Sequence, residues 1–220
     1  MSRATFRLLA FLSLLAMAGW IGMAAPLAAQ EGQEVRLFNG KNFSGWTYHL
    51  RDSDKKLEEV WSIDDGVLTC KGDPRGYLRT EQDYTNYVLK LEWRFPGKPG
   101  NSGVLLRMVG EDKVWPKSIE AQLHHQNAGD IWNIDKFPMK VDPARTSGRR
   151  TVKLKESSEK PLGDWNEYEI ALDGPKLTLK VNRVVQNEAA ECEVVPGKIC
   201  LQSEGAEVQF RNIRLIPLKP

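Results

Sequence analysis

The fold expected for this chain depends on two short runs, Gly100-Asn101-Ser102-Gly103-Val104-Leu105-Leu106-Arg107 and Ser118-Ile119-Glu120-Ala121-Gln122-Leu123-His124-His125. Both are expected to be β-strands, because their apolar residues recur at every second position. In the second run the apolar side chains would share one face, and Ser118, Glu120, Gln122 and His124 the other. An acid, an amide and an imidazole in succession suit neither a core nor an ordinary surface strand. The row therefore predicts the floor of a polar site; the alternative is a plain solvent-exposed face of an antiparallel sheet.

The same alternation recurs along most of the chain. Asp64-Asp65-Gly66 between the apolar runs 60–63 and 67–70 is a strong hairpin signal. The strand expected at Tyr87 to Phe95 should bury Leu89, Leu91 and Trp93 between two sheets. Other alternating strands are expected at 34–38, 77–80, 164–172, 176–181, 197–202 and 207–216. The last strand changes register at Arg211-Asn212, which predicts a bulge. Residues 51–59 and the region from His125 to about Leu162 are expected as loops. With no helical periodicity, this pattern predicts an all-β, two-sheet antiparallel sandwich or jelly roll.

The first 29 residues have the layout of a secretory signal peptide. Arg3 and Arg7 precede an apolar run that continues to Met23, and small residues follow up to Ala29. We expect cleavage after Ala29 and a periplasmic or secreted protein; an uncleaved membrane anchor is the alternative. Residues 30–220 are then expected to form one β-sandwich domain, with no further segment able to span a bilayer.

Charge and cysteine content exclude some classes of partner. The formal net charge of +2 falls to zero when residues 1–29, with two arginines, are removed, and no basic stripe predicts nucleic-acid binding. The odd number of cysteines, Cys70, Cys192 and Cys200, permits at most one disulfide, with Cys192 and Cys200 able to close a small loop. No Cys/His spacing resembles a zinc site.

A series of motifs in order resembles one bacterial family. The segments are Phe38-Asn39-Gly40-Lys41, Gly45-Trp46, Trp61 to Leu68, Gly100 to Arg107, Ile119-Glu120-Ala121-Gln122, Gly163-Asp164-Trp165-Asn166 and Phe210-Arg211-Asn212-Ile213. The chain is similar over residues 34–217 to the 3-keto-disaccharide hydrolase domain family, formerly DUF1080. The resemblance implies a concanavalin A-like jelly roll and a carbohydrate substrate.

Carried over residue by residue, the family's polar strand residues fall on Arg107, Glu120 and Gln122. A classical glycosidase needs two carboxyl groups, and the strand of Glu120 carries no second one. A 3-keto sugar needs one base, because the ketone acidifies the C2 proton and the C1 substituent can leave by elimination before water adds. His124 suits that base, with Glu120 as base or metal ligand and Arg107 holding the enolate oxygen.

The remaining expectations concern substrate binding and cofactors. We assign substrate contacts to Gln122, Asn101, Ser102, Trp132, Asn133 and Trp115, the two tryptophans by stacking on a sugar ring. A divalent metal ion held by Glu120 and His124 with oxygen ligands is possible, although the sequence has no dedicated metal motif. The expected function is an exported enzyme acting on 3-keto glycosides; the alternative is a carbohydrate-binding module of the same fold without catalysis.

Overall fold

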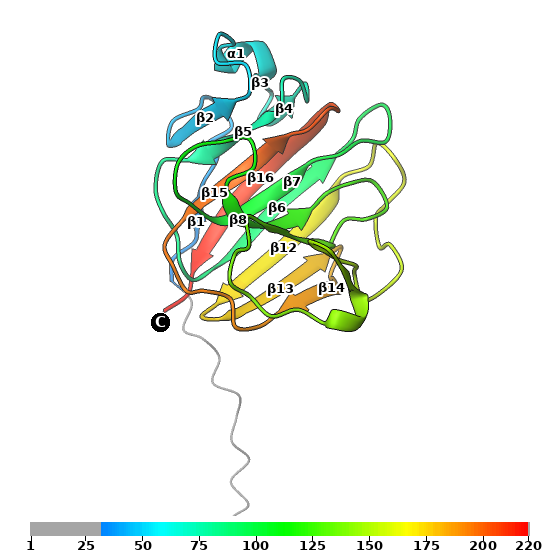
Figure 1. Cartoon of the computed structure of the whole chain (residues 1–220). Helices are drawn as coiled ribbons and strands as arrows, with labels where there is room; N and C mark the ends of the chain where they lie inside the picture. The colour runs from blue at the N-terminus through cyan, green and yellow to red at the C-terminus, as the bar shows by residue number, and fades with distance from the viewer. Residues whose placement is uncertain (1–31, 220) are drawn as a thin grey trace, which may run out of the picture.

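Two antiparallel sheets of eight strands each are stacked face to face in residues 32–219, the part of the chain that the computed structural model describes (Figure 1). The expected signal peptide, residues 1–29, lies outside the described residues. Because each strand alternates apolar and polar positions, each sheet has one face to bury, and the two apolar faces close on each other. The predicted all-β sandwich is confirmed.

The first sheet contains both ends of the described chain. Its hydrogen-bonded order is β14 (Val184–Ala189), β13 (Lys176–Val181), β12 (Asn166–Asp173), β6 (Tyr87–Arg94), β16 (Val208–Pro217), β4 (Val67–Cys70) and β3 (Trp61–Asp64), with β1 (Val35–Arg36) also paired to β16. The Gly32 N–H donates to the Pro217 carbonyl, so the two ends lie side by side.

The second sheet contains the strands of the runs 100–107 and 118–125. Its order is β10 (Thr146–Ser147), β11 (Arg150–Thr151), β9 (Ile131–Ile134), β8 (Lys117–Gln122), β7 (Gly103–Val109), β15 (Lys198–Ser203), β5 (Gly76–Thr80) and β2 (Trp46–Leu50). Strands β8 and β15 flank β7, so residues about 80 positions apart in sequence meet across a single strand.

The core lies between the sheets, as the alternation predicts. Leu89, Leu91 and Trp93 of β6 are at most 2% exposed, and so are the inward residues of the neighbouring strands: Tyr168, Ile170, Leu177 and Leu179. From the other sheet, Ile119 and Ala121 of β8 face the same cluster. The predicted face of β8 is therefore correct: its apolar residues point inward, and Glu120 and Gln122 point to the outer face.

Local predictions hold where turn chemistry or alternation is strong and fail where a strand lacks both. The 61–70 hairpin forms as β3 and β4, and β16 changes register between Arg211 and Arg214 with Asn212 at φ +53°. The expected loop after His125 contains β9, β10 and β11, and β14 was also not predicted. The charged segment 51–59 runs into a one-turn helix, α1 (Leu57–Val60), and η1 (Pro143–Arg145) is a 3₁₀ turn. Strands β9, β10 and β11 have only two to four residues and lack a turn signal like Asp-Gly, whereas β14 has six residues whose apolar side chains do not alternate.

All three cysteines are buried and unpaired. Cys70, Cys192 and Cys200 are free thiols, so the loop that Cys192 and Cys200 could have closed is not closed by a disulfide. Burial raises the pKa of Cys70 and of Cys192 to about 11, so these thiols stay protonated near neutrality. Among the helices of residues 32–219, none is long and apolar enough to cross a membrane.

Candidate functional site

A pocket of about 190 Å³ opens on the outer face of the second sheet. Strand β8 supplies Glu120 and Gln122, and β9 supplies Trp132 directly opposite Glu120 in the strand pairing. Loops between strands complete the lining, which consists of Asn101, Trp115, Glu120, Gln122, Trp132, Ile134, Arg149 and Glu204. The pocket therefore combines two carboxyl groups, two indoles, two amides and one guanidinium.

A larger hollow of about 390 Å³ lies on the outer face of the first sheet. Its charged side chains are mostly paired with one another: Lys180 and Lys90 both contact Glu169, at 2.7 and 3.5 Å, and Arg183 lies 3.8 Å from Glu167. Such paired charges satisfy each other and leave little to attract a ligand. The smaller pocket is the better candidate because its polar groups are largely buried.

Gly103 leaves the space that the pocket residue Glu120 occupies. Gly103 lies on β7 between Gln122 of β8 and Gln202 of β15, and it presents no side chain to the outer face. A β-carbon placed there would lie 2.7 Å from Oε1 of Glu120 and closer still to Oε1 of Gln202. The glycine therefore lets two long side chains from strands that are not adjacent meet above the sheet.

Both carboxyl groups of the pocket have raised pKa values. Burial raises the pKa of Glu120 to about 8, with a further contribution from the charge of Glu204; the nearby Gln202 amide and Arg149 offset this only in part. Burial also raises the pKa of Glu204 to about 7, against the charge of Arg75. Near neutral pH, Glu120 is thus mainly a neutral acid, whereas Glu204 is poised between its two forms.

Several polar atoms around the pocket have no hydrogen-bond partner within residues 32–219. They are Oδ1 of Asn101, Nε1–H of Trp132 and both amide atoms of Gln202. Buried polar groups are normally paired, so a cluster of unpaired donors and acceptors indicates that water or a polar ligand completes them. A hydroxyl-rich molecule offers both kinds of partner.

Arg107 does not reach this pocket, contrary to the sequence hypothesis. It lies at φ +46°, in the irregularity of the β7–β8 pairing, and is fully buried. Its guanidinium donates to the carbonyls of Thr85, Gly174 and Glu193 at 2.8–3.2 Å. The irregular backbone redirects the side chain, and three carbonyls occupy the donors that an enolate oxygen would need.

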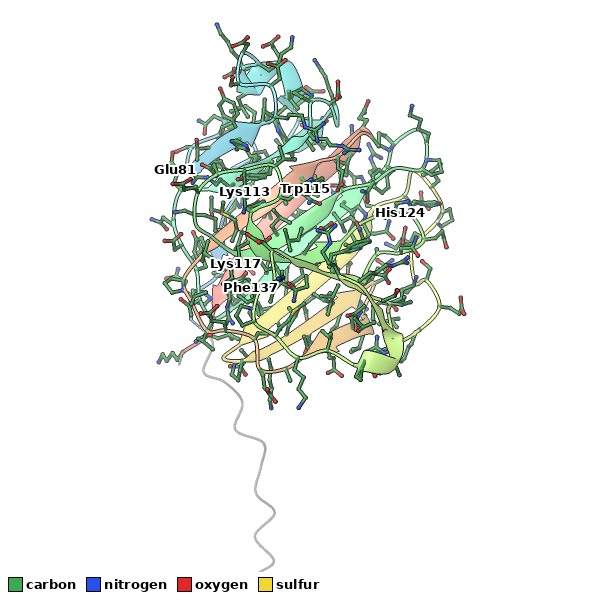
Figure 2. All side chains as sticks on the ribbon, in the orientation of Figure 1. Glu81, Lys113, Trp115, Lys117, His124 and Phe137 are labelled. Atoms are coloured by element: carbon green, nitrogen blue, oxygen red, sulfur yellow. The ribbon has the colours of Figure 1, made fainter. Side chains whose placement is uncertain are left out.

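His124 is also outside the pocket. Strand β8 ends at Gln122, whose Oε1 accepts hydrogen bonds from the backbone N–H groups of Leu123 and His124 and so starts a turn. The His124 ring is exposed and lies 2.9 Å from the Asn127 amide. Figure 2 shows His124 well to one side of Trp115. The alternation that placed His124 beside Glu120 breaks because the strand stops two residues earlier.

The other predicted substrate residues divide between the two faces. Asn101, Gln122, Trp115 and Trp132 line the pocket. Ser102 does not: its hydroxyl is buried and donates to the Gln202 carbonyl at 2.9 Å. Asn133 is not among the lining residues either, because it follows Trp132 on β9 and donates to the Phe137 carbonyl at 2.9 Å. These two residues hold the strands that carry the site.

Sequence reasoning missed Glu204, Gln202 and Arg149. A signal for the first two was present, because Gln202-Ser203-Glu204 repeats in reverse the spacing of Glu120-Ala121-Gln122. Only the pairing of β15 with β7 brings the two patterns together. Arg149 enters from the turn between β10 and β11, where its guanidinium lies 5.6 Å from the centre of the Trp132 ring.

The pocket does not reproduce the expected metal ligands. His124 is outside it, and among residues 32–219 no group of three or more His, Cys, Asp and Glu side chains gathers to hold an ion. The two pocket carboxyls alone fall short of the six or more oxygen ligands that Ca²⁺ takes.

The sheets and the pocket on their outer face define a β-sandwich of the concanavalin A-like class. A family model described as the 3-keto-alpha-glucoside-1,2-lyase-like domain matches residues 33–216, and the chain belongs to this family. No curated protein sequence matches the chain.

Solved structures share the fold at low sequence identity. A candidate glycosyl hydrolase from Parabacteroides distasonis is 23% identical, with a TM-score of 0.64 over 84% of this chain and 94% of that one. A beta-glucanase from Bacillus licheniformis is 12% identical, with a TM-score of 0.58 over 86% and 100%. A carbohydrate-binding module from Bacillus subtilis is 10% identical, with a TM-score of 0.56 over 79% and 96%. The fold thus occurs in both enzymes and binding modules.

Proposed function

We propose that this protein is an exported enzyme that cleaves the glycosidic bond of 3-keto glycosides by elimination followed by addition of water. The observation that carries the proposal is the pair Glu120 and Glu204, two carboxyl groups with raised pKa values in one pocket lined by indoles. Family membership supports the class of substrate. Burial of titratable groups weakens folding, and groups with strongly shifted pKa values gather at catalytic sites, whereas a binding module of the same fold has no need for them.

The two carboxyls fit the two proton transfers of an elimination. Glu204, with a pKa of about 7, is the base that removes the proton from C2 of the 3-keto ring. Glu120, with a pKa of about 8, is the acid that gives a proton to the departing glycosidic oxygen. A classical retaining glycosidase needs one carboxylate that stays ionised as nucleophile, and neither group has the low pKa for that role.

The reaction has two stages, elimination of the C1 substituent and addition of water. Removal of the C2 proton leaves an enolate whose charge rests on the C3 oxygen, and Arg149 and the Trp132 N–H are donors near enough to the pocket to stabilise it. The enolate electrons re-form the C3 ketone and a C1–C2 double bond as the C1–O bond breaks, and the leaving oxygen takes the Glu120 proton. Water then adds hydroxide at C1 and a proton at C2, giving the free 3-keto sugar.

The test is a pH–rate profile with a 3-keto disaccharide as substrate. Because the base must be ionised and the acid protonated, kcat/KM should rise as pH approaches 7 and fall above about 8. Glu204→Gln and Glu120→Gln should each lower kcat by at least about 100-fold. The control is His124→Ala, which should change kcat/KM by less than about threefold, because an exposed side chain outside the pocket is being removed.

Three outcomes would contradict the proposal. Cleavage of unoxidised disaccharides at the same rate would indicate a classical glycosidase. Sugar binding without turnover at any pH would favour the binding module. Full activity of both glutamine variants would remove the carboxyl pair from the mechanism. A parallel assay with chelator tests for a divalent ion, and an unchanged rate is expected.

A further inference from the structure

Part of the outer face of the second sheet is shielded from solvent and carries buried apolar side chains. Tyr77, Leu105, Met108, Ile134 and Cys200 project from four different strands on this face and are at most 3% exposed. They form an apolar cluster separate from the core between the sheets, and Trp115 packs on it. Trp115 belongs to residues 110–116, which connect β7 to β8 and which we call the 110–116 loop.

Asp112 fastens this loop to the sheet beneath it. Its carboxylate accepts a hydrogen bond from the Tyr77 hydroxyl at 2.8 Å and two from Arg79, Nε and Nη2, at 2.9 Å each. Burial alone would raise the pKa of Asp112, but the hydrogen bonds from Arg79 and Tyr77 outweigh it and hold the pKa below its ordinary value. The paired arrangement with Arg79 fixes direction as well as distance. The loop is thereby fixed to β5, a strand on the far side of β7 and β15.

The fastened loop closes one end of the pocket. Trp115 lines the pocket together with Glu120 and Ile134, so the floor of β8 cannot continue as an open groove beyond this indole. Ser118, on the same face of β8 and two residues before Glu120, is fully buried. Lys113 and Trp115 stand on this part of the molecule in Figure 2. The remaining volume of about 190 Å³ is smaller than the roughly 300–1,000 Å³ of pockets for drug-sized ligands.

We infer that the 110–116 loop, fastened by Asp112, makes the enzyme selective for a single sugar ring at the end of a glycan. The inference rests on the proposed function and adds to it which position of the oxidised ring is accepted. A terminal 3-keto ring enters against Trp115 with nothing attached beyond it. An internal 3-keto ring carries a second sugar, and that sugar collides with the loop. Asp112 is a positioning residue here, because it acts through Trp115.

The experiment compares two substrates: a disaccharide whose nonreducing ring carries the 3-ketone, and a trisaccharide whose middle ring carries it. Wild-type protein should cleave the disaccharide with a kcat/KM at least about tenfold higher than that for the trisaccharide, the scale on which one steric contact discriminates. Asp112→Asn should reduce this ratio at least about fivefold, mainly through KM, because the loop is released while Glu120 and Glu204 stay in place. Trp115→Ala should reduce the ratio in the same direction and serves if the first variant is poorly folded.

The matched control is Asp135→Asn. Asp135 makes the other salt bridge of the loop, with Lys113 at 2.7 Å, but both side chains are about half exposed. Its backbone has φ +54°, which asparagine adopts readily. Because an exposed pair contributes little, this variant should keep the wild-type ratio.

Binding separates failure of this inference from failure of the proposed function. Both sugars are titrated against the wild-type protein and followed by tryptophan fluorescence, which needs no turnover. If neither sugar is cleaved but the disaccharide alone binds, the enzyme proposal fails and the loop's selectivity stands. Equal cleavage of both sugars by wild type, an unchanged ratio in both loop variants, or no binding of either sugar overturns the inference.

Discussion

Gly103 shows how a residue without a side chain can determine a site. It belongs to the Gly-Asn-Ser-Gly segment of the sequence and lies between Glu120 and Gln202 on the outer face. No positive φ requires glycine there, so its conformational freedom is not the reason for its presence. The reason is space, because the Glu120 and Gln202 side chains fill the volume that a β-carbon would take.

Gly103→Ala should therefore impair the site more than the fold. The added methyl group would push the Glu120 carboxyl and the Gln202 amide apart, and we expect kcat/KM to fall at least about tenfold, since misplacing a catalytic group by about 1 Å costs up to about 100-fold. The thermal midpoint should drop by no more than a few degrees, because long side chains can move aside. The measurement is steady-state kinetics with calorimetry, and Gly97→Ala is the control for a glycine substitution as such, because Gly97 has open space around it and no positive φ. Wild-type kinetics in Gly103→Ala would contradict this account.

Gln122 illustrates the limit of residue-level prediction. Its position on the outer face follows from alternation, but its Oε1 is used to turn the chain after β8. That turn carries His124 away from the pocket. The sequence contains the residues of the turn but not the point at which pairing with β9 gives way to it.

At the scale of elements, the irregularity in β7 has a structural role. Leu106 still pairs with Ile119, but the register resumes only at Val109 and Lys117, and Arg107 lies between. Its guanidinium bonds to the segment before β6, the turn between β12 and β13 and the segment before β15. Arg107, on the second sheet, thus binds one turn of the first sheet and two segments that connect the two sheets.

Arg107→Met should test this role by keeping the aliphatic stem and removing the donors. Three partly buried carbonyls would lose their partners, and we expect the free energy of unfolding to fall by about 2–4 kcal/mol. Turnover per folded molecule should change little, because the guanidinium is far from the pocket carboxyls. Urea unfolding and active-site titration measure the two quantities, with Arg214→Met as a control. Arg214 makes only a half-exposed pair with Glu34 at 3.8 Å and should cost under about 1 kcal/mol. A large loss of kcat without loss of stability would return Arg107 to the catalytic site.

For the molecule as a whole, the motifs that resemble the family serve two purposes. Phe38-Asn39-Gly40-Lys41 and Phe210-Arg211-Asn212-Ile213 meet on the first sheet, where the N–H groups of Leu37 and Phe38 donate to the Ile213 carbonyl. Asn39 organises its own turn by accepting from the N–H groups of Lys41 and Asn42. These motifs secure the sandwich, whereas Gly103, Glu120 and Gln122 build the pocket on the opposite sheet.

Export is the prediction that belongs to the whole chain. Residues 1–29 should be removed during secretion, because their charged start, apolar run and small residues match a signal peptide. Expression of the full chain in a bacterial host, fractionation and intact-mass spectrometry should find the mature protein outside the cytoplasm and lacking these residues. Extracytoplasmic protein that retains Met1 would instead favour the uncleaved anchor.

Periodicity and motifs in the sequence were enough to predict the fold class, the core and one wall of the site. Alternation along β6, β8, β12 and β13 predicts which side chains are buried, because successive side chains of a strand point to opposite faces. A shift of one residue would move all the apolar side chains of the strand to the solvent face. The same logic placed Glu120 and Gln122 on the outer face. Trp115 and Trp132 were assigned on other grounds, the ability of an indole to stack on a sugar ring, and both line the pocket.

Which groups meet in the pocket depends on how distant segments of the chain pair in the folded protein. Glu204 reaches Glu120 because β15 pairs with β7 across more than 90 residues of chain, and Arg149 arrives on a hairpin too short to show a period. Arg107 lies outside the pocket because the β7–β8 pairing is irregular at that residue, and His124 lies outside it because β8 ends at Gln122. Strand pairing, register breaks and loop paths depend on contacts between distant segments, and local periodicity carries no information about those contacts.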